Sequence, residues 1–563
     1  MSLPRQAYAA VAIAALLPIL YILPLITPFW SARYLVVILI GIVGIPAVIA
    51  NRQRPEAKAA LVFAAVTASS AAVSGSAWAI FGDFGLGTGL LFVLGLIGSW
   101  AVGGISGDGR HAVVLACCFG AALNATMALA EVLLDLDEVG FGTHPTRASG
   151  FIGNPVFLGG YLAAAAWLVI NQHLEDRRWW HLPLLTLLGA GIQLSGSRAA
   201  LILVVIACGL GILRTCRVGL LVLAFAVVGI VGGSGVAAAA DVASGTSRVV
   251  DSVSSGGTRA RLEAWTSARH AVIERPLLGA GPGRFGVATS PHRTLRLAQA
   301  EGTERYFFDA HNLLVEHLVT TGVLGFAALV AWISLVLRRT RPLRDPLAAF
   351  GAGLLLMHLV QPQNVVLTPL AFLALGAAAP AMELPSWARR TSLGLGVATV
   401  PAVAYLAFGF FALDQARLDF EQVRADQARR ILPGWTQVTE QAARVSALRA
   451  RIERRPDLEQ QALAYRRMAV AENPGDPRPL RTLVQYEGQL GLGDAQIRSL
   501  RRLYRIDPWS ITALRGLGLH HADGGRARGD EARRAVSFLE RSLLVGRPNP
   551  AVEDLIDSLR SRY

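Results

Sequence analysis

The chain has 563 residues, of which 53% are hydrophobic and only 16% are charged, and its formal net charge is +14. A soluble protein would carry about a quarter charged residues, so most of this chain is expected to lie in lipid. The basic excess is spread over many short segments rather than gathered in one patch, which argues against a nucleic-acid-binding protein. The cysteines have neither metal-ligand nor disulfide-framework spacing: Cys117, Cys118, Cys208 and Cys216.

Apolar runs that are long enough, or nearly long enough, to cross a membrane recur up to residue 413. They predict an all-α fold, in which a polytopic bundle of about 12–13 transmembrane helices is followed by an α-solenoid. The first run is too long for the core of a signal peptide, so we expect it to be retained. The runs lie near 7–27, 34–50, 59–80, 84–104, 112–134, 155–170, 182–195, 199–213, 218–240, 311–337, 346–360, 364–382 and 391–413.

Arginine and lysine concentrate in every second connection between these runs. If the N-terminus is inside, the inner connections hold the basic clusters near Arg52, Arg110, Arg177, Arg214 and Arg338. The outer connections hold few basic residues, and this asymmetry indicates the direction of every span. The pattern therefore predicts that the long polar segment 241–310 lies outside.

Three polar motifs from distant parts of the sequence fall on this outer face. His144–Gly150, with Arg147, leads to Asn154, and Ser195–Arg198 forms a hairpin between two short runs. The third is the loop 241–310, which is followed by His311. The loop carries more arginines than carboxylates, so we expect it to receive an anion. Its arginines include Arg259, Arg261, Arg269, Arg275 and Arg284.

Individual residues of these motifs allow two interpretations each. Arg261 and Trp265 lie one helical turn apart, so the ring can support the guanidinium, or both can belong to a solvated surface helix. His311 can accept a proton from a substrate, or can bond a carbonyl at the membrane interface. Asn312 can orient a hydroxyl or cap a helix. Arg198 can hold a lipid-linked phosphate or anchor the end of a span. No metal-ligand spacing stands out, so we predict a reaction without metal or cofactor.

The composition becomes charged and helical after Leu413. Pro474 and Pro508 lie 508 − 474 = 34 residues apart, which is the tetratricopeptide period. We predict a tetratricopeptide-like solenoid that lies outside and docks a protein partner or presents the acceptor. The predicted domains are 1–240 (N-terminal spans), 241–310 (large outer loop), 311–413 (C-terminal spans) and 414–563 (helical repeats).

The order of the motifs resembles the O-antigen ligase superfamily. The resemblance covers roughly 145–380 and rests on Ser195–Arg198, Arg261 with Trp265, Pro276–Gly281, His311-Asn312 with Glu316, and Thr321–Gly325. It implies a GT-C-type glycosyltransferase of the bacterial inner membrane, with its loop in the periplasm and an undecaprenyl-diphosphate-linked glycan as donor. It also implies that His311, Arg198 and Arg261 are catalytic. Around them we predict a substrate-binding set: Arg147, Asn154, Ser197, Arg259, Trp265 and Asn312.

The sequence thus predicts an inverting, metal-independent transfer of a glycan to an acceptor hydroxyl of a glycolipid, glycan or protein. The alternatives within the superfamily are a polysaccharide polymerase and a protein O-oligosaccharyltransferase. A transporter with an exterior binding domain is more distant, because the runs lack evident inverted repeats and charged midplane residues.

Overall fold

The computed structural model describes residues 7–20, 30–83, 86–136, 146–240, 242, 244–245, 257–301 and 306–562. All regular structure among these residues is helical, which confirms the predicted all-α bundle. Some predicted features lie outside the described residues: His144 and Pro145, the end of the first apolar run (21–27) and the loop residues 246–256.

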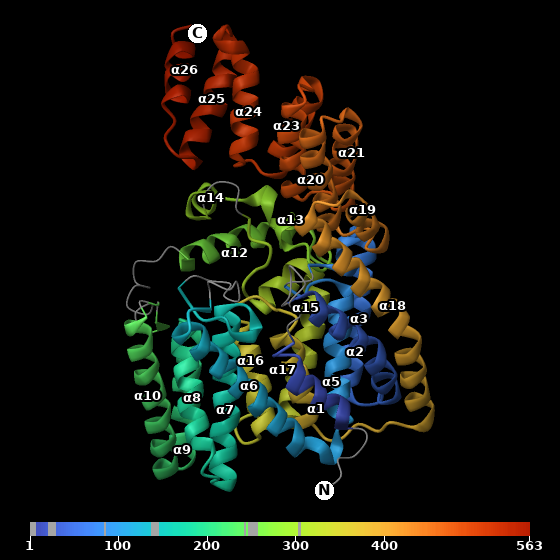
Figure 1. Cartoon of the computed structure of the whole chain (residues 1–563), viewed down its shortest axis with the longest axis vertical. Coiled ribbons are helices and arrows are strands. Elements are labelled where there is room, and N and C mark those ends of the chain that lie inside the picture. The colour runs from blue at the N-terminus through green and yellow to red at the C-terminus, as the bar shows by residue number, and fades with distance from the viewer. Residues whose placement is uncertain are drawn as a thin grey trace.

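The membrane part is a bundle of helices (Figure 1). Seven of the described helices are long and apolar enough to cross a membrane. They are α2 (Ser31–Ala50), α3 (Pro55–Ser74), α6 (Arg110–Leu133, with the short η2 turn before it), α7 (Pro155–Asp176), α10 (Cys216–Ala239), α15 (Leu313–Thr340) and α18 (Ser386–Asp419).

Shorter helices fill the bundle between these spans. They are α1 (Tyr8–Leu16), α4 (Trp78–Phe81), α5 (Leu90–Gly104), α8 (His181–Leu194), α9 (Arg198–Arg214), α16 (Pro346–Met357) and α17 (Leu367–Ala378). Every residue of α17 is buried, so this helix is covered by protein rather than by lipid. The end of α16 meets the start of α15, where the Leu313 N–H donates to the His358 carbonyl at 2.7 Å.

The loop is tied to α15 by a backbone contact that only glycine permits. Gly322 interrupts α15 with a φ of 68°, and the following Val323 N–H donates to the Pro276 carbonyl at 2.8 Å. A Cβ on Gly322 would lie 2.3 Å from the Leu277 oxygen, and a Cβ on Gly279 would lie 2.5 Å from the Thr320 carbonyl carbon. The motifs Pro276–Gly281 and Thr321–Gly325 are therefore two sides of one packed joint.

The loop and the C-terminal helices lie at one end of the bundle (Figure 1). The loop contains α12 (Gly257–Glu274), α13 (Phe285–Thr289) and α14 (Leu295–Glu301). The last span, α18, runs on to Asp419, beyond the predicted boundary at Leu413. The C-terminal helices are α19 (Gln422–Ile431), α20 (Thr436–Glu453), α21 (Pro456–Glu472), α22 (Pro477–Gln489), α23 (Gly493–Ile506), α24 (Ile511–Ala522), α25 (Gly529–Val545) and α26 (Pro550–Arg560).

Helices that follow one another in the C-terminal domain pack together, and breaks fall at Pro474 and Pro508 as the spacing predicts. Its assignment to the tetratricopeptide class stays a prediction. The domain touches both the loop and the bundle. Arg284 of the loop donates to the Pro474 carbonyl at 2.7 Å and to the Ser74 carbonyl at 3.0 Å. Burial in this joint lowers the pKa of Arg284 to about 10.

Candidate active site

Helix α12 crosses the end of the bundle and buries one face. Its alanines recur at helical spacing and pack against the neighbouring loop segments: Ala260, Ala264, Ala268 and Ala271. Trp265 lies beside this face, and its Nε1–H donates to the Ala310 carbonyl at 2.9 Å. Trp265 therefore ties α12 to the segment that carries His311, and Arg261 is half-buried one turn away.

The segment before α15 holds His311 next to a carboxylate. Nδ1 of His311 lies 2.9 Å from Oδ1 of Asp309, and the same oxygen accepts the His311 backbone N–H at 2.7 Å. His311 has a φ of 50°, a conformation that non-glycine residues adopt uncommonly. The neighbouring Ala310 N–H donates to Glu316 at 2.9 Å. The hydrogen bonds hold the backbone that carries His311, and Nδ1 of its ring lies beside the Asp309 carboxylate.

A cavity of about 380 Å³ opens at this end of the bundle, and Arg261 and His311 both line it. We call it the Arg261–His311 cavity. Its polar wall residues are Asn154, Arg261, Asp309, His311 and Gln361, and its apolar ones are Trp30, Leu86, Val156, Phe157, Phe308 and Pro362. The site thus offers a cation and a histidine–carboxylate pair beside an apolar surface. This combination suits a ligand with an anionic group and a hydrocarbon part.

Two asparagines predicted to bind substrate serve as helix caps. Asn154 accepts the N–H groups of Val156 and Phe157, so it starts α7 while also lining the cavity. Asn312 accepts the N–H groups of Leu314 and Val315 and donates to the Leu359 carbonyl at 2.9 Å. For Asn312, the capping interpretation accounts for these contacts of its amide.

Arg198, Ser197 and Arg147 form a separate polar turn next to the cavity and do not line it. Arg147 donates from Nε and Nη2 to the Ser195 carbonyl, at 2.8 and 2.6 Å. The turn packs on Gly159 of α7, where a Cβ would lie 2.4 Å from the Ser197 Cβ. Since Asn154 begins the same helix, α7 links the turn to the cavity. Arg259 is exposed on α12 and is not in the cavity wall.

Two polar wall residues were not among the predicted site residues. Asp309 stands two positions before His311, and an acidic residue so close to a candidate proton acceptor was an available signal. Gln361 is fully buried and belongs to the short polar stretch Gln361–Asn364 between two apolar runs. This polar interruption between apolar runs was an available signal. The proximity of Gln361 to His311 was not predictable in this way, because it depends on how α16 packs against α15.

The family model described as O-antigen ligase matches residues 183–330. This part of the chain is therefore similar to the O-antigen ligase family. The match extends from α8 to α15 and includes Arg198, Arg261, His311 and the glycine joint at Gly279 and Gly322. A search of the curated proteins found no match. The match supports the conclusion that the protein is a membrane glycosyltransferase, whose substrates are in general a lipid-linked glycan and an acceptor.

Among the described residues, no group of three or more histidine, cysteine or carboxylate side chains has the arrangement to hold a metal ion. Metal independence stays a prediction of the sequence.

Proposed function

We propose that the protein transfers a glycan from an undecaprenyl-diphosphate-linked donor to an acceptor hydroxyl, with the Arg261–His311 cavity as the reaction site. The observation that carries this proposal is the meeting of Arg261 with the His311–Asp309 pair in one cavity with a partly apolar wall. A lipid diphosphate needs both features, because its charge requires a cation and its polyprenyl chain requires an apolar path.

The chemistry follows from the side chains. The acceptor oxygen bonds to the anomeric carbon as the bond from that carbon to the diphosphate oxygen breaks. The electron pair of the broken bond leaves with the diphosphate, where a guanidinium stabilises the developing charge. The acceptor proton passes to His311, whose ring is oriented by Asp309. Attack from the side opposite the leaving group inverts the anomeric centre.

We further propose that the loop and the C-terminal domain face the periplasm across a bacterial inner membrane. Arginine-rich connections such as Arg52–Arg54 and Arg177–Arg178 lie at the ends of helices remote from the loop, as a cytoplasmic face requires. Lipid-linked glycan and acceptor would then meet at the outer membrane surface of the bundle.

A complementation experiment tests the proposal. Cells that lack the protein are supplied with the wild type, with Arg261→Ala or with Arg269→Ala, whose arginine is exposed on the same helix. We expect the wild type and Arg269→Ala to restore the glycosylated product, whereas Arg261→Ala accumulates lipid-linked glycan. The product identifies the acceptor: a glycolipid indicates a ligase, a longer lipid-linked glycan a polymerase, and a glycoprotein a protein O-oligosaccharyltransferase. If Arg269→Ala is equally defective, the loop acts as a diffuse basic surface and the residue assignment is wrong.

A further inference from the structure

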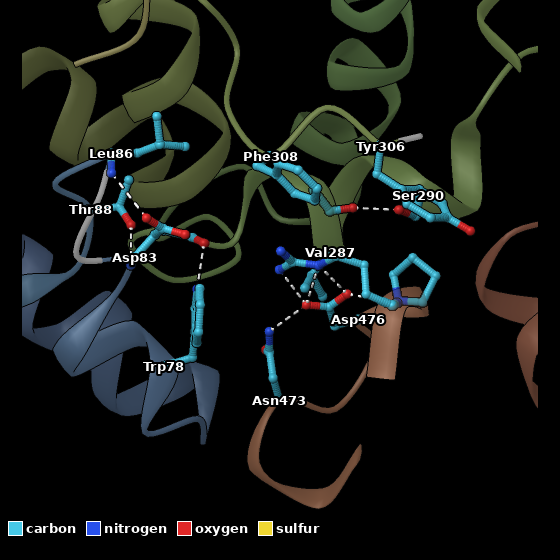
Figure 2. Close-up of a pocket in the computed structure, with 14 residues that line it drawn as sticks. Trp78, Asp83, Leu86, Thr88, Val287, Ser290, Tyr306, Phe308, Asn473 and Asp476 are labelled. Atoms are coloured by element: carbon cyan, nitrogen blue, oxygen red, sulfur yellow. Dashed lines mark hydrogen bonds and ion pairs between the residues drawn. The ribbon is translucent and has the colours of Figure 1, made fainter. Parts of the chain in front are cut away.

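The C-terminal domain reaches the chain segment that carries the His311–Asp309 pair. Figure 2 shows Tyr306 and Phe308, which precede this pair, opposite Asn473 and Asp476 of the C-terminal domain. Arg478 lies two positions after Asp476 in the C-terminal domain. Its guanidinium carbon lies 4.2 Å from the centroid of the Phe308 ring, which is within cation–π range. Phe308 lines the Arg261–His311 cavity and is followed directly by Asp309.

The guanidinium of Arg478 is itself held in place. Asp476 accepts hydrogen bonds from Nε of Arg478 at 3.0 and 3.1 Å and from Nη2 at 2.6 Å. The same carboxylate caps α22 by accepting the Arg478 backbone N–H at 2.9 Å, and it accepts the Asn473 amide at 3.0 Å. A guanidinium fixed in this way presents a defined surface to Phe308.

A second contact holds the other end of the same segment. Asp507, at the break between α23 and α24, is fully buried and lies 3.2 Å from Nη1 of Arg293 in the loop. The Arg293 guanidinium carbon lies 5.1 Å from the centroid of the Tyr306 ring. The C-terminal domain therefore contacts the segment through Arg478 and Phe308, and again through Asp507, Arg293 and Tyr306.

The cleft between these residues is not a ready site for a sugar. Its free volume is about 20 Å³, which has room for about one water molecule. Its carboxylates are already used, because Asp476 binds Arg478 while Asp83 accepts the Leu86 N–H and the Gln437 amide. The cleft shares Leu86 and Phe308 with the Arg261–His311 cavity, so it is a packed joint behind the wall of that cavity.

We propose that the C-terminal domain positions the segment that carries Asp309 and His311, with Arg478 acting through Phe308 and Asp507 acting through Arg293 and Tyr306. Arg478 is a positioning residue in this account. The inference rests on the proposed transfer reaction, because it concerns the residues assigned to that reaction. It implies that the domain contributes to the rate of transfer even when no partner protein is bound to it.

The test measures transfer by purified full-length variants, with lipid-linked glycan extracted from cells that lack the protein as donor and the membranes of those cells as acceptor. We expect Arg478→Ala to lower kcat about 10- to 100-fold, the scale for a displacement of about 1 Å at a reacting group. The KM for the donor should stay within about two-fold, because Arg478 is not in the cavity wall. Arg478→Lys should recover part of the rate. The control is Arg467→Ala, which removes a charge from the same domain near Glu487 and should have the wild-type kcat.

A double variant separates positioning from general stability. If Arg478 acts through Phe308, Arg478→Ala combined with Phe308→Ala should be no slower than Phe308→Ala alone. Thermal unfolding of each variant is followed in parallel, and Asp507→Asn gives a second route if Arg478→Ala folds poorly. A wild-type kcat in both Arg478→Ala and Asp507→Asn, or a change confined to the donor KM, would overturn the proposal. Full activity of His311→Ala in the same assay would instead reject the proposed function.

Discussion

Replacing Asp309 by Asn tests the histidine–carboxylate pair with the least structural change. The substitution keeps the size of the side chain and the oxygen that accepts the His311 backbone N–H at 2.7 Å, but it removes the charge 2.9 Å from Nδ1. When His311 is protonated, we expect this pair to form a hydrogen bond to a charged group, which contributes ~1.5–3 kcal/mol, whereas a hydrogen bond to a neutral group contributes ~0.5–1.5 kcal/mol. The Asp309 side chain is only 7% exposed, so solvent screens little of the difference.

The difference between the two kinds of hydrogen bond is about 1–1.5 kcal/mol, and Asp309→Asn loses it when His311 gains the acceptor proton. We therefore expect Asp309→Asn to transfer the glycan about ten-fold more slowly than the wild type. Initial rates of transfer by the purified protein measure it. The matched control is Glu274→Gln, because Glu274 lies 3.2 Å from Nε2 of His292 in the same loop but outside the Arg261–His311 cavity. A wild-type rate in Asp309→Asn, or an equal loss in Glu274→Gln, would refute the role of the pair.

Three further predictions concern the cation, the metal and the orientation. Arg261→Ala should slow transfer about 10²–10³-fold, the scale for losing a donor to developing charge, and Arg261→Lys should rescue it only in part. Arg198→Ala should have an effect of the same order, which would extend the diphosphate site beyond the cavity to the Ser195–Arg198 turn, whereas a wild-type rate would remove Arg198 from the catalytic set. EDTA should leave the rate unchanged, whereas loss of activity that a divalent ion restores would assign the diphosphate to a metal. A cysteine at the exposed Ser537 of α25 should react with a membrane-impermeant thiol reagent in cells with a permeable outer layer. The exposed native Cys216, at the start of α10 and far from the loop, should react only after the membrane is broken. The reverse order would contradict the proposed orientation.

The fold was largely predictable because lipid imposes strong rules on sequence. Apolar runs had to become helices, since backbone groups in hydrocarbon must satisfy one another. The structure has a helix in each predicted run, including the short α16 and α17. The end of α18 was less predictable, because a helix that leaves the membrane can continue through polar residues such as Asp414, which is buried.

The candidate site was predictable only in part. Arg261 and His311 stood out because each is a polar residue in a distinctive position, and the structure brings them to one cavity. Arg198 stood out equally, yet it is not among the residues that line this cavity. The contribution of the C-terminal domain left no local signal, because Arg478 meets Phe308 only after two distant segments pack together. Long-range contacts of this kind depend on tertiary packing rather than on periodicity or motif.

In the proposed reaction, His311 takes part in the transfer of a glycan from a lipid diphosphate. The most direct measurement quantifies free lipid diphosphate and glycosylated acceptor in one reaction, with the purified wild type and with His311→Ala. We predict that the wild type forms both products in equal amounts, whereas His311→Ala forms neither and keeps the thermal stability of the wild type. Equal formation of both products by His311→Ala would contradict the account.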